Sequence, residues 1–269
     1  MRYIAVTSGK GGVGKTTISL NLVTALSRYG RQVILIDANF DFPNLGLMLG
    51  KSNFEETIVS AIEGQKDIDK TIYRHQSGLK LIPGSISMEN LRKKDIEQFN
   101  KLLPELHDKA EALVLDTGAG LNEENLNIIK NCHDLLIVTT PDFIAITETL
   151  KMIKVARSHD KNILGIIVNR FTGRDYDMKI ENIQTLLNER VIAVVPEDRA
   201  VKEALKLKYP VIYSHPNAPS TVAIEKLACN LIGVQYKEKE PEKKGKLADI
   251  MDKVGLKKWY EALKEEDED

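Results

Sequence analysis

The ten residues "SGKGGVGKTT", Ser8–Thr17, decide the fold of this chain. From Gly9 to Thr16 they fit the pattern G-x-x-x-x-G-K-[ST], in which glycines let backbone N–H groups turn toward a phosphate. The pattern has this meaning between a strand and a helix, because the helix N-terminus adds a dipole that favours an anion. An apolar strand is predicted at Arg2–Thr7, and a helix is predicted from Thr16. The sequence therefore predicts a nucleotide-phosphate-binding loop.

The chemistry expected of this region divides among a few side chains. Lys15 is expected to reach the β- and γ-phosphates, and the Thr16 hydroxyl is expected to ligate Mg²⁺. Asp116 ends the predicted strand Ala112–Asp116, and a carboxylate at that end of a parallel strand points into the ligand crevice. We therefore expect ATP and Mg²⁺ as cofactors. The loop residues expected to contact the nucleotide are Gly11, Gly12, Val13, Gly14, Lys15, Thr16 and Thr17.

The composition excludes several classes of protein. The 269 residues include 38 basic and 39 acidic ones, with a formal net charge of −1, so no specific nucleic-acid partner is expected. Cys132 and Cys229 are the only cysteines, and no C-x-x-C pair is present to hold zinc or an iron–sulfur cluster. No secretory signal or membrane-spanning run is visible in the sequence, so a reduced, cytoplasmic protein is expected.

Short apolar runs alternate with helical stretches along the chain. The runs are rich in Val, Ile and Leu without polar alternation, which is typical of strands covered on both faces. This alternation predicts a doubly wound α/β fold, with a mainly parallel sheet and helices on both faces. The predicted strands are Arg2–Thr7, Gln32–Asp37, Leu79–Pro83, Ala112–Asp116, Leu135–Thr140, Ile163–Asn169 and Val191–Pro196. The predicted helices include Thr16–Tyr29, Asn90–His107, Ile144–Ser158 and Ile180–Glu189.

A change in composition divides the chain into three predicted parts. Residues 1–235 form the P-loop domain, with no internal repeat. Residues 236–246 are a charged linker that contains Pro241 and Gly245. Residues 247–269 have apolar side chains at helical spacing, which predicts an amphipathic helical tail.

The phosphate-binding loop is similar to that of the MinD/ParA family of P-loop ATPases, in which a second, signature lysine begins the loop. Lys10 matches that lysine. Within the family, the chain resembles archaeal and bacterial MinD-like proteins most, over a stretch that extends to about Gly233. The segments that carry the resemblance are "DANFDFPNLGLMLG" (Asp37–Gly50) and "LDTGAG" (Leu115–Gly120) as switches, "VTTPD" (Val138–Asp142) and "VNR" (Val168–Arg170) as strand ends, and "VPEDRAV" (Val195–Val201) as the base-contact loop.

The resemblance implies an ATP-sandwiched homodimer in which Lys10 crosses to the partner's phosphates, as an arginine finger does. Adenine is expected to be held by Asn169 and by backbone near Pro196–Asp198, and no N-K-x-D string for guanine follows this strand. The implied catalytic residues are Lys10, Lys15, Asp37 and Asn39, and the implied magnesium ligands are Thr16, Asp37 and Asp116. The implied base-site residues are Asn169, Arg170, Pro196, Glu197 and Asp198.

One switch residue departs from the family pattern. MinD-like first switches carry D-x-D, whereas this chain has Asp37–Ala38–Asn39. An amide donates and accepts hydrogen bonds but takes no proton, so binding is expected to persist and hydrolysis to be slow. Asp41 is a candidate to substitute for the missing carboxylate if the loop bends.

The tail departs as well. Residues 247–269 contain four lysines and eight acidic residues, whereas a MinD tail is expected to be a basic, lipid-binding helix. An acidic segment is repelled by anionic lipid, and each missing basic contact would have been worth roughly 1 kcal/mol. Docking of the tail to its own domain or to an unknown protein partner is therefore favoured over binding to a membrane. A peripheral location at the membrane stays an alternative.

The leading function is a nucleotide-driven switch that positions cell-division or other cellular machinery. A ParA-type ATPase that partitions DNA or cargo is a second alternative, although "RKK" (Arg92–Lys94) is only a short basic run. An iron–sulfur carrier of the Mrp type is a third, and the missing C-x-x-C pair disfavours it. A nucleotide-dependent scaffold that does not hydrolyse ATP is a fourth, and Asn39 makes it credible.

Overall fold

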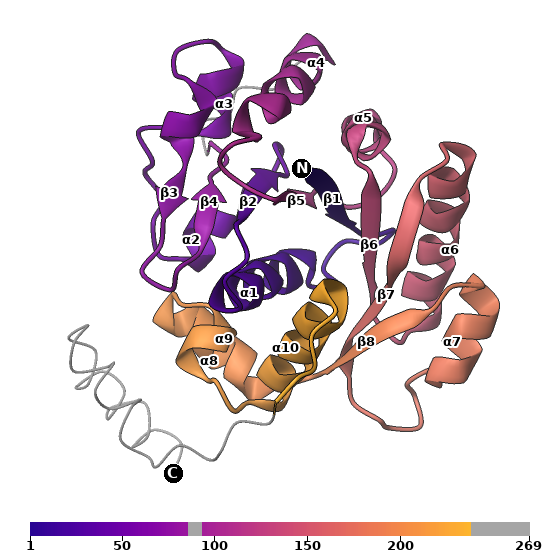
Figure 1. Ribbon diagram of the computed structural model, residues 1–269. Coiled ribbons are helices and arrows are strands. Elements are labelled where there is room, and N and C mark those ends of the chain that lie inside the picture. The colour runs from indigo at the N-terminus through magenta and orange to yellow at the C-terminus, as the bar shows by residue number, and fades with distance from the viewer. Residues whose placement is uncertain (86–92, 238–269) are drawn as a thin grey trace, which may run out of the picture. The chain divides into compact units, whose positions relative to one another are not determined.

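The computed structural model describes residues 1–85 and 93–237. Within these residues, eight strands form one sheet in the order β3-β4-β2-β5-β1-β6-β7-β8 (Figure 1). Neighbouring strands are parallel except for β3 and β4, which pair antiparallel. The strands are β1 (Arg2–Thr7), β2 (Val33–Ala38), β3 (Tyr73–Arg74), β4 (Lys80–Ile82), β5 (Ala112–Thr117), β6 (Asp134–Thr139), β7 (Asn162–Phe171) and β8 (Val191–Pro196).

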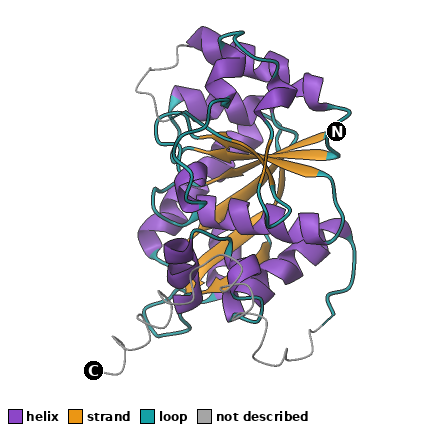
Figure 2. Ribbon diagram, turned by 90° about the vertical axis from the view of Figure 1, so that its left-hand side faces the viewer, coloured by secondary structure: helices purple, strands orange, loops and turns teal. Residues whose placement is uncertain are grey.

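Helices cover both faces of this sheet, as Figure 2 shows. Two buried apolar clusters result, one with residues of α1, α9 and α10 and the other with residues of α3 to α7. The longer helices are α1 (Lys15–Arg28), α4 (Lys93–Leu102), α5 (Glu123–Asn131), α6 (Phe143–Ser158), α7 (Ile180–Leu187), α8 (Arg199–Leu207) and α10 (Pro219–Ile232). The short ones are α2 (Leu45–Met48), α3 (Ile58–Ile62), α9 (Val211–Ser214) and the 3₁₀ turns Ile68–Thr71 and Leu103–Leu106.

The strand order places a ligand crevice at the centre of the sheet. β1 lies between β5 and β6, with Val6 opposite Asp116 and Thr7 opposite Ile137. The chain therefore winds outward in both directions from β1, and such a switch point opens a crevice beyond the carboxyl ends of the strands. The loop after Thr7 and the end of β5 both lie at that edge.

Local sequence explains where the helices beside this crevice begin and end. Asp142 caps α6, because its carboxylate accepts a hydrogen bond of 2.9 Å from the N–H of Ala145. α10 begins with Pro219, which needs no N–H partner there, and ends at Gly233 with φ 69°. The helices that frame the site are thus fixed by their own terminal residues.

The predicted doubly wound α/β fold is confirmed, with two local differences. The helix predicted over Asn90–His107 is α4 only to Leu102, because Pro104 lacks an N–H and the chain continues as a 3₁₀ turn. The edge strand β3 was not predicted, since two residues are too short to show a pattern.

The chain forms a compact unit over Met1–Gln235. Most of the predicted linker, residues 236–246, and all of the predicted tail, residues 247–269, lie outside the described residues. In residues 1–85 and 93–237, no helix has both the length and the apolar character that crossing a membrane requires.

Candidate functional site

The phosphate-binding loop turns between β1 and α1 on glycines in the left-handed backbone region. Gly12 has φ 78° and Gly14 has φ 93°, values that a side chain disfavours. A Cβ on Gly14 would also lie 2.3 Å from Nδ2 of Asn169. That amide donates a hydrogen bond of 2.8 Å to the carbonyl oxygen of Val13. The loop is therefore seated on the end of β7, and its shape requires glycine.

Lys15 lies inside the protein at the start of α1. Its side chain is buried, and burial lowers the pKa of the ammonium group while Asp116 raises it. Burial raises the pKa of Asp116, and hydrogen bonds from Thr16 and Ser19 partly offset that rise. The bond from Ser19 Oγ is 2.8 Å long. A buried lysine beside the glycine loop is placed where the predicted contact with phosphate requires a cation, and that contact stays a prediction.

Asp37 and Asp116 are cross-strand neighbours on β2 and β5. Burial raises the pKa of Asp37 to about 8, and the negative charge of Asp116 adds to that shift. Two buried carboxylates with the Thr16 hydroxyl bonded to one of them form the oxygen donor set that Mg²⁺ prefers. A divalent cation would offset the repulsion between the carboxylates, so these residues fit the predicted ion.

The first switch wraps around the Asp37 carboxylate. Backbone N–H groups of Asn39 and Leu45 donate to its two oxygens at 3.4 and 3.1 Å. The side-chain Nδ2 of Asn39 donates to the carbonyl oxygen of Phe42 at 2.8 Å. Asn39 Oδ1 lies 3.3 Å from the position that a Cβ would take on Gly118, in the second switch. Asn39 therefore belongs to the first switch and lies close to Gly118 in the second.

Asp41, the candidate to substitute for the missing carboxylate, lies near Glu124 of α5. Burial raises the pKa of Glu124 in α5 to about 7, the charge of Asp41 adds to the rise, and a hydrogen bond from the Phe40 N–H opposes it. The hydrogen bond from the backbone N–H of Phe40 to the Glu124 carboxylate therefore joins the first switch to α5, and the Asp41 carboxylate lies near it.

Lys10 contacts its own chain. Its Nζ lies 3.3 Å from Oδ1 of Asp142, and the two side chains are 40% and 46% exposed. Asp142 also accepts hydrogen bonds from Thr140 Oγ1 at 2.6 Å and from the capped turn of α6. In the single chain, the signature lysine is thus held at the surface by the residue that caps α6.

A pocket of about 210 Å³ lies beside the phosphate loop and unites the predicted base-site residues. Glu197 lies 3.9 Å from Arg170 and 3.4 Å from Lys202 across ion pairs at this pocket. Arg170 has φ 57°, which directs the backbone sharply at the end of β7. The pocket is lined by Thr17, Ile18, Asn169, Arg170, Val195, Pro196, Glu197, Asp198, Val201, Lys202, Leu205 and Ile224.

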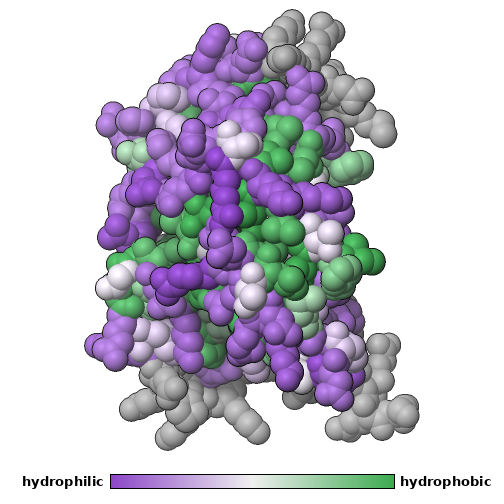
Figure 3. All heavy atoms as spheres, turned by 90° about the vertical axis from the view of Figure 1, so that its right-hand side faces the viewer, coloured by the Kyte–Doolittle hydropathy of each residue, from purple (hydrophilic) through white to green (hydrophobic). Residues whose placement is uncertain are grey.

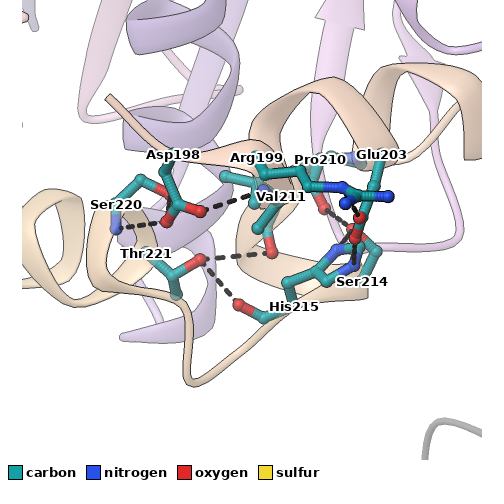
Figure 4. Close-up of polar contacts among 10 residues, drawn as sticks. Asp198, Arg199, Glu203, Pro210, Val211, Ser214, His215, Ser220 and Thr221 are labelled. Atoms are coloured by element: carbon teal, nitrogen blue, oxygen red, sulfur yellow. Dashed lines mark hydrogen bonds and ion pairs between the residues drawn. The ribbon is translucent and has the colours of Figure 1, made fainter. Parts of the chain in front are cut away.

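The carboxylate of Asp198 holds the pocket wall in place. It accepts hydrogen bonds from the N–H of Ala200 and from both the N–H and Oγ of Ser220, at 2.8 to 2.9 Å (Figure 4). Thr221 Oγ1 donates to the carbonyl of His215 at 2.8 Å, which ties α9 to α10. The Asp198 carboxylate is therefore engaged by α8 and α10, and the predicted contact of its backbone with adenine stays a prediction.

These features define a P-loop nucleotide-binding protein: a glycine loop, a buried lysine and two carboxylates at the central crevice of a doubly wound sheet. The chain belongs to the CobQ/CobB/MinD/ParA nucleotide-binding domain family, which matches residues 4–211. An uncharacterized ATP-binding protein of Methanocaldococcus jannaschii is 36% identical over 241 residues, covering 90% of this chain and 91% of that protein.

Two solved structures are similar as well. The septum site-determining protein MinD of Pyrococcus horikoshii, complexed with Mg-ADP, has a TM-score of 0.76 and 28% identity, covering 86% of this chain and 95% of that one. The MinC:MinD cell division complex of Aquifex aeolicus contains a chain with a TM-score of 0.78 and 29% identity, covering 89% of this chain and 99% of that one.

Some residues of the site were missed by sequence reasoning. Ser19 was not singled out, although a hydroxyl one turn into α1 can face the end of β5. Lys202 was missed because its position in the pocket depends on the packing of α8. Asn125 was missed too, although "LNEEN" places several polar residues just after the second switch.

Proposed function

We propose that this chain is an ATP-dependent dimerisation switch of the MinD type, which hydrolyses ATP slowly and positions cell-division or other cellular machinery. The observation that carries the proposal is the opposite placement of two lysines on one loop. Lys15 is 8% exposed, whereas the side chain of Lys10 is 40% exposed. In this proposal the buried lysine serves the nucleotide of its own chain, and the exposed one at the same loop serves a second copy once it leaves Asp142.

Exposed apolar side chains, at the start of α6 beside Lys10 and in the first switch, support an interface on this part of the surface. Phe143 and Ile144, which directly follow its partner Asp142, are 71% and 64% exposed, and Phe42 in the first switch is 73% exposed. Figure 3, which looks at the side of α6 and α7, shows apolar side chains grouped among polar ones. Large apolar side chains that gather at a surface favour a contact with another protein, and a second copy is the partner we propose.

Mg²⁺ and ATP are the proposed cofactors. Asp37, Asp116 and Thr16 provide the oxygen donors for the ion, and Lys15 provides the charge for the phosphates. A relative with the same fold holds Mg-ADP, which supports this choice.

Sedimentation velocity with a non-hydrolysable ATP analogue and with ADP, each with Mg²⁺, tests the proposal. We expect a dimer with the analogue and a monomer with ADP. Lys10→Ala should abolish the dimer while leaving nucleotide binding by the monomer within about threefold, because an exposed charge contributes little to its own site. Lys154→Ala, an exposed lysine on α6, is the matched control. A protein that stays monomeric with the analogue would exclude the switch.

We also propose that the tail, residues 247–269, binds a protein partner, and its acidic balance is what supports this. A chain ending at residue 235 should dimerise as the full chain does. Neither form should float with anionic vesicles, and flotation of the full chain alone would favour a membrane role instead.

A further inference from the structure

In the side-chain amide of Asn125, the nitrogen donates hydrogen bonds whereas the oxygen accepts none. The residue is 1% exposed and lies in the first turn of α5. Its Nδ2 donates to the carbonyl oxygens of Ala119 and Gly120 at 3.0 and 3.3 Å, so these two carbonyls fix which atom is nitrogen. Its Oδ1 is buried and receives no hydrogen bond. A buried acceptor without a donor is costly, so it points to a ligand that supplies one.

This oxygen, Oδ1 of Asn125, lies next to Gly118 in the second switch. A Cβ on Gly118 would lie 2.8 Å from Oδ1 of Asn125 and 3.3 Å from Oδ1 of Asn39. Two amide oxygens, one from α5 and one from the first switch, therefore converge on the same glycine. Nδ2 of Asn39 is already committed to Phe42, which leaves its oxygen for an incoming donor.

Two convergent acceptors suit a ligand with two hydrogens to donate, and the smallest such ligand is water. We propose that Asn125, together with Asn39, orients the water that attacks the γ-phosphate, an inference that rests on the proposed ATPase function. The water donates one hydrogen to each amide oxygen, which leaves a lone pair of its oxygen for phosphorus. The new P–O bond forms as the bond to the β-phosphate oxygen breaks. The released proton passes to a phosphate oxygen, because an amide takes none.

The alternative is that Asn125 merely holds the second switch through Nδ2. Asn125→Asp separates the two roles, since it keeps an oxygen at the Oδ1 position but places another against the carbonyls of Ala119 and Gly120. If Asn125 orients water, Asn125→Asp hydrolyses faster than Asn125→Ala. If Asn125 merely holds the loop, Asn125→Asp is as slow as Asn125→Ala or slower, because oxygen then opposes oxygen.

Single-turnover hydrolysis of pre-bound Mg·ATP is the measurement, with the ATP dissociation constant and thermal unfolding recorded beside it. Asn125→Ala should slow hydrolysis about tenfold, as expected for one lost hydrogen bond, with ATP affinity nearly unchanged. Asn131→Ala, at the exposed end of α5, is the matched control. A rate that Asn125→Ala leaves unchanged, or a rate that falls only in step with affinity, overturns the proposal.

A double-mutant cycle with Asn39→Asp gives a second readout. A carboxylate at residue 39 can hold the water by itself, so Asn125→Ala should cost less in that background. Equal losses in both backgrounds mean that Asn125 does not share the water with residue 39, and they also overturn the proposal. If the native protein shows no turnover at all, the ATPase function and this inference fail together. If the native protein hydrolyses ATP at a rate that Asn125→Ala does not change, the inference alone fails.

Discussion

Asn39 occupies the position where a carboxylate is expected in the first switch. Its amide can orient a water but cannot accept the proton that the water loses, and phosphoryl transfer depends mainly on positioning and electrostatics. Asp37 does not replace that function, because its two oxygens accept hydrogen bonds from the backbone N–H groups of Asn39 and Leu45. These features favour tight binding of Mg·ATP with a long-lived bound state.

Asn39→Asp is expected to raise the rate of hydrolysis by about tenfold or more, since a general base contributes at least that much in most enzymes. Single-turnover hydrolysis of pre-bound ATP measures it. Asp41→Ala is the companion variant: if Asp41 substitutes for the missing carboxylate, this variant should be slower than the native protein. A native protein that hydrolyses briskly, with a rate that neither variant changes, would contradict the slow-switch interpretation.

At the scale of elements, the first turn of α5 joins the two switches. Glu124 accepts a hydrogen bond from the N–H of Phe40 in the first switch, and Asn125 donates to Ala119 and Gly120 in the second. Two adjacent residues of one helix thus hold both segments that surround the nucleotide. A change in the conformation of either switch is therefore expected to alter the conformation of the other through this turn of α5.

Glu124 gives this contact a dependence on pH. Burial raises its pKa to about 7, so between its unfolded value near 4.5 and 7 the folded protein binds the extra proton. Stability therefore falls as pH rises through that window. Glu124→Gln should remove the fall and stabilise the protein at about pH 8 by roughly 1 kcal/mol, a figure reduced for partial exposure.

Urea unfolding near pH 5 and near pH 8 measures the effect of Glu124→Gln. Glu123→Gln makes the same change of charge at the exposed neighbouring position and should leave the pH dependence as it is in the native protein. If native protein and Glu124→Gln lose stability equally between the two pH values, Glu124 does not carry the proton.

The sequence predicted elements well where burial is uniform and poorly where tertiary contacts decide. All six residues of β2 are buried, so their run of apolar side chains revealed the strand. The phosphate loop was predictable because its glycines and lysine act locally. The empty oxygen of Asn125 was not, because it results from the path of the second switch across α5. The contact between Lys10 and Asp142 joins positions 132 residues apart, so no local pattern could reveal it.

At the scale of the whole molecule, the strand order brings the proposed dimer surface and the nucleotide site to one edge. The phosphate loop follows β1, and Asp142 follows β6, its neighbour in the sheet. Lys10 and the capped start of α6 therefore meet beside the crevice in one chain. If Lys10 serves a second copy, it must first leave Asp142, so the intrachain ion pair competes with assembly.

Asp142→Asn is therefore expected to strengthen ATP-dependent dimerisation. Asparagine keeps the cap of α6, since it is as good an N-cap as aspartate, and removes only the charge that holds Lys10. The pair is about half exposed, such pairs contribute about 0.2–1 kcal/mol each, and a symmetric dimer breaks two of them, so the dimer dissociation constant should fall about twofold to thirtyfold. The gain should shrink as salt rises, because exposed charges are screened.

Sedimentation equilibrium with a non-hydrolysable ATP analogue, at low and at high salt, measures this change. Asp67→Asn removes the charge of another exposed ion pair, with Lys70 at 2.7 Å, and should leave dimerisation unchanged. The double variant Lys10→Ala/Asp142→Asn should dimerise no better than Lys10→Ala, because the benefit of Asp142→Asn depends on the freed lysine. If Asp142→Asn strengthens the dimer equally with and without Lys10, the charge of Asp142 itself opposes the dimer. The ion pair with Lys10 would then not compete with assembly.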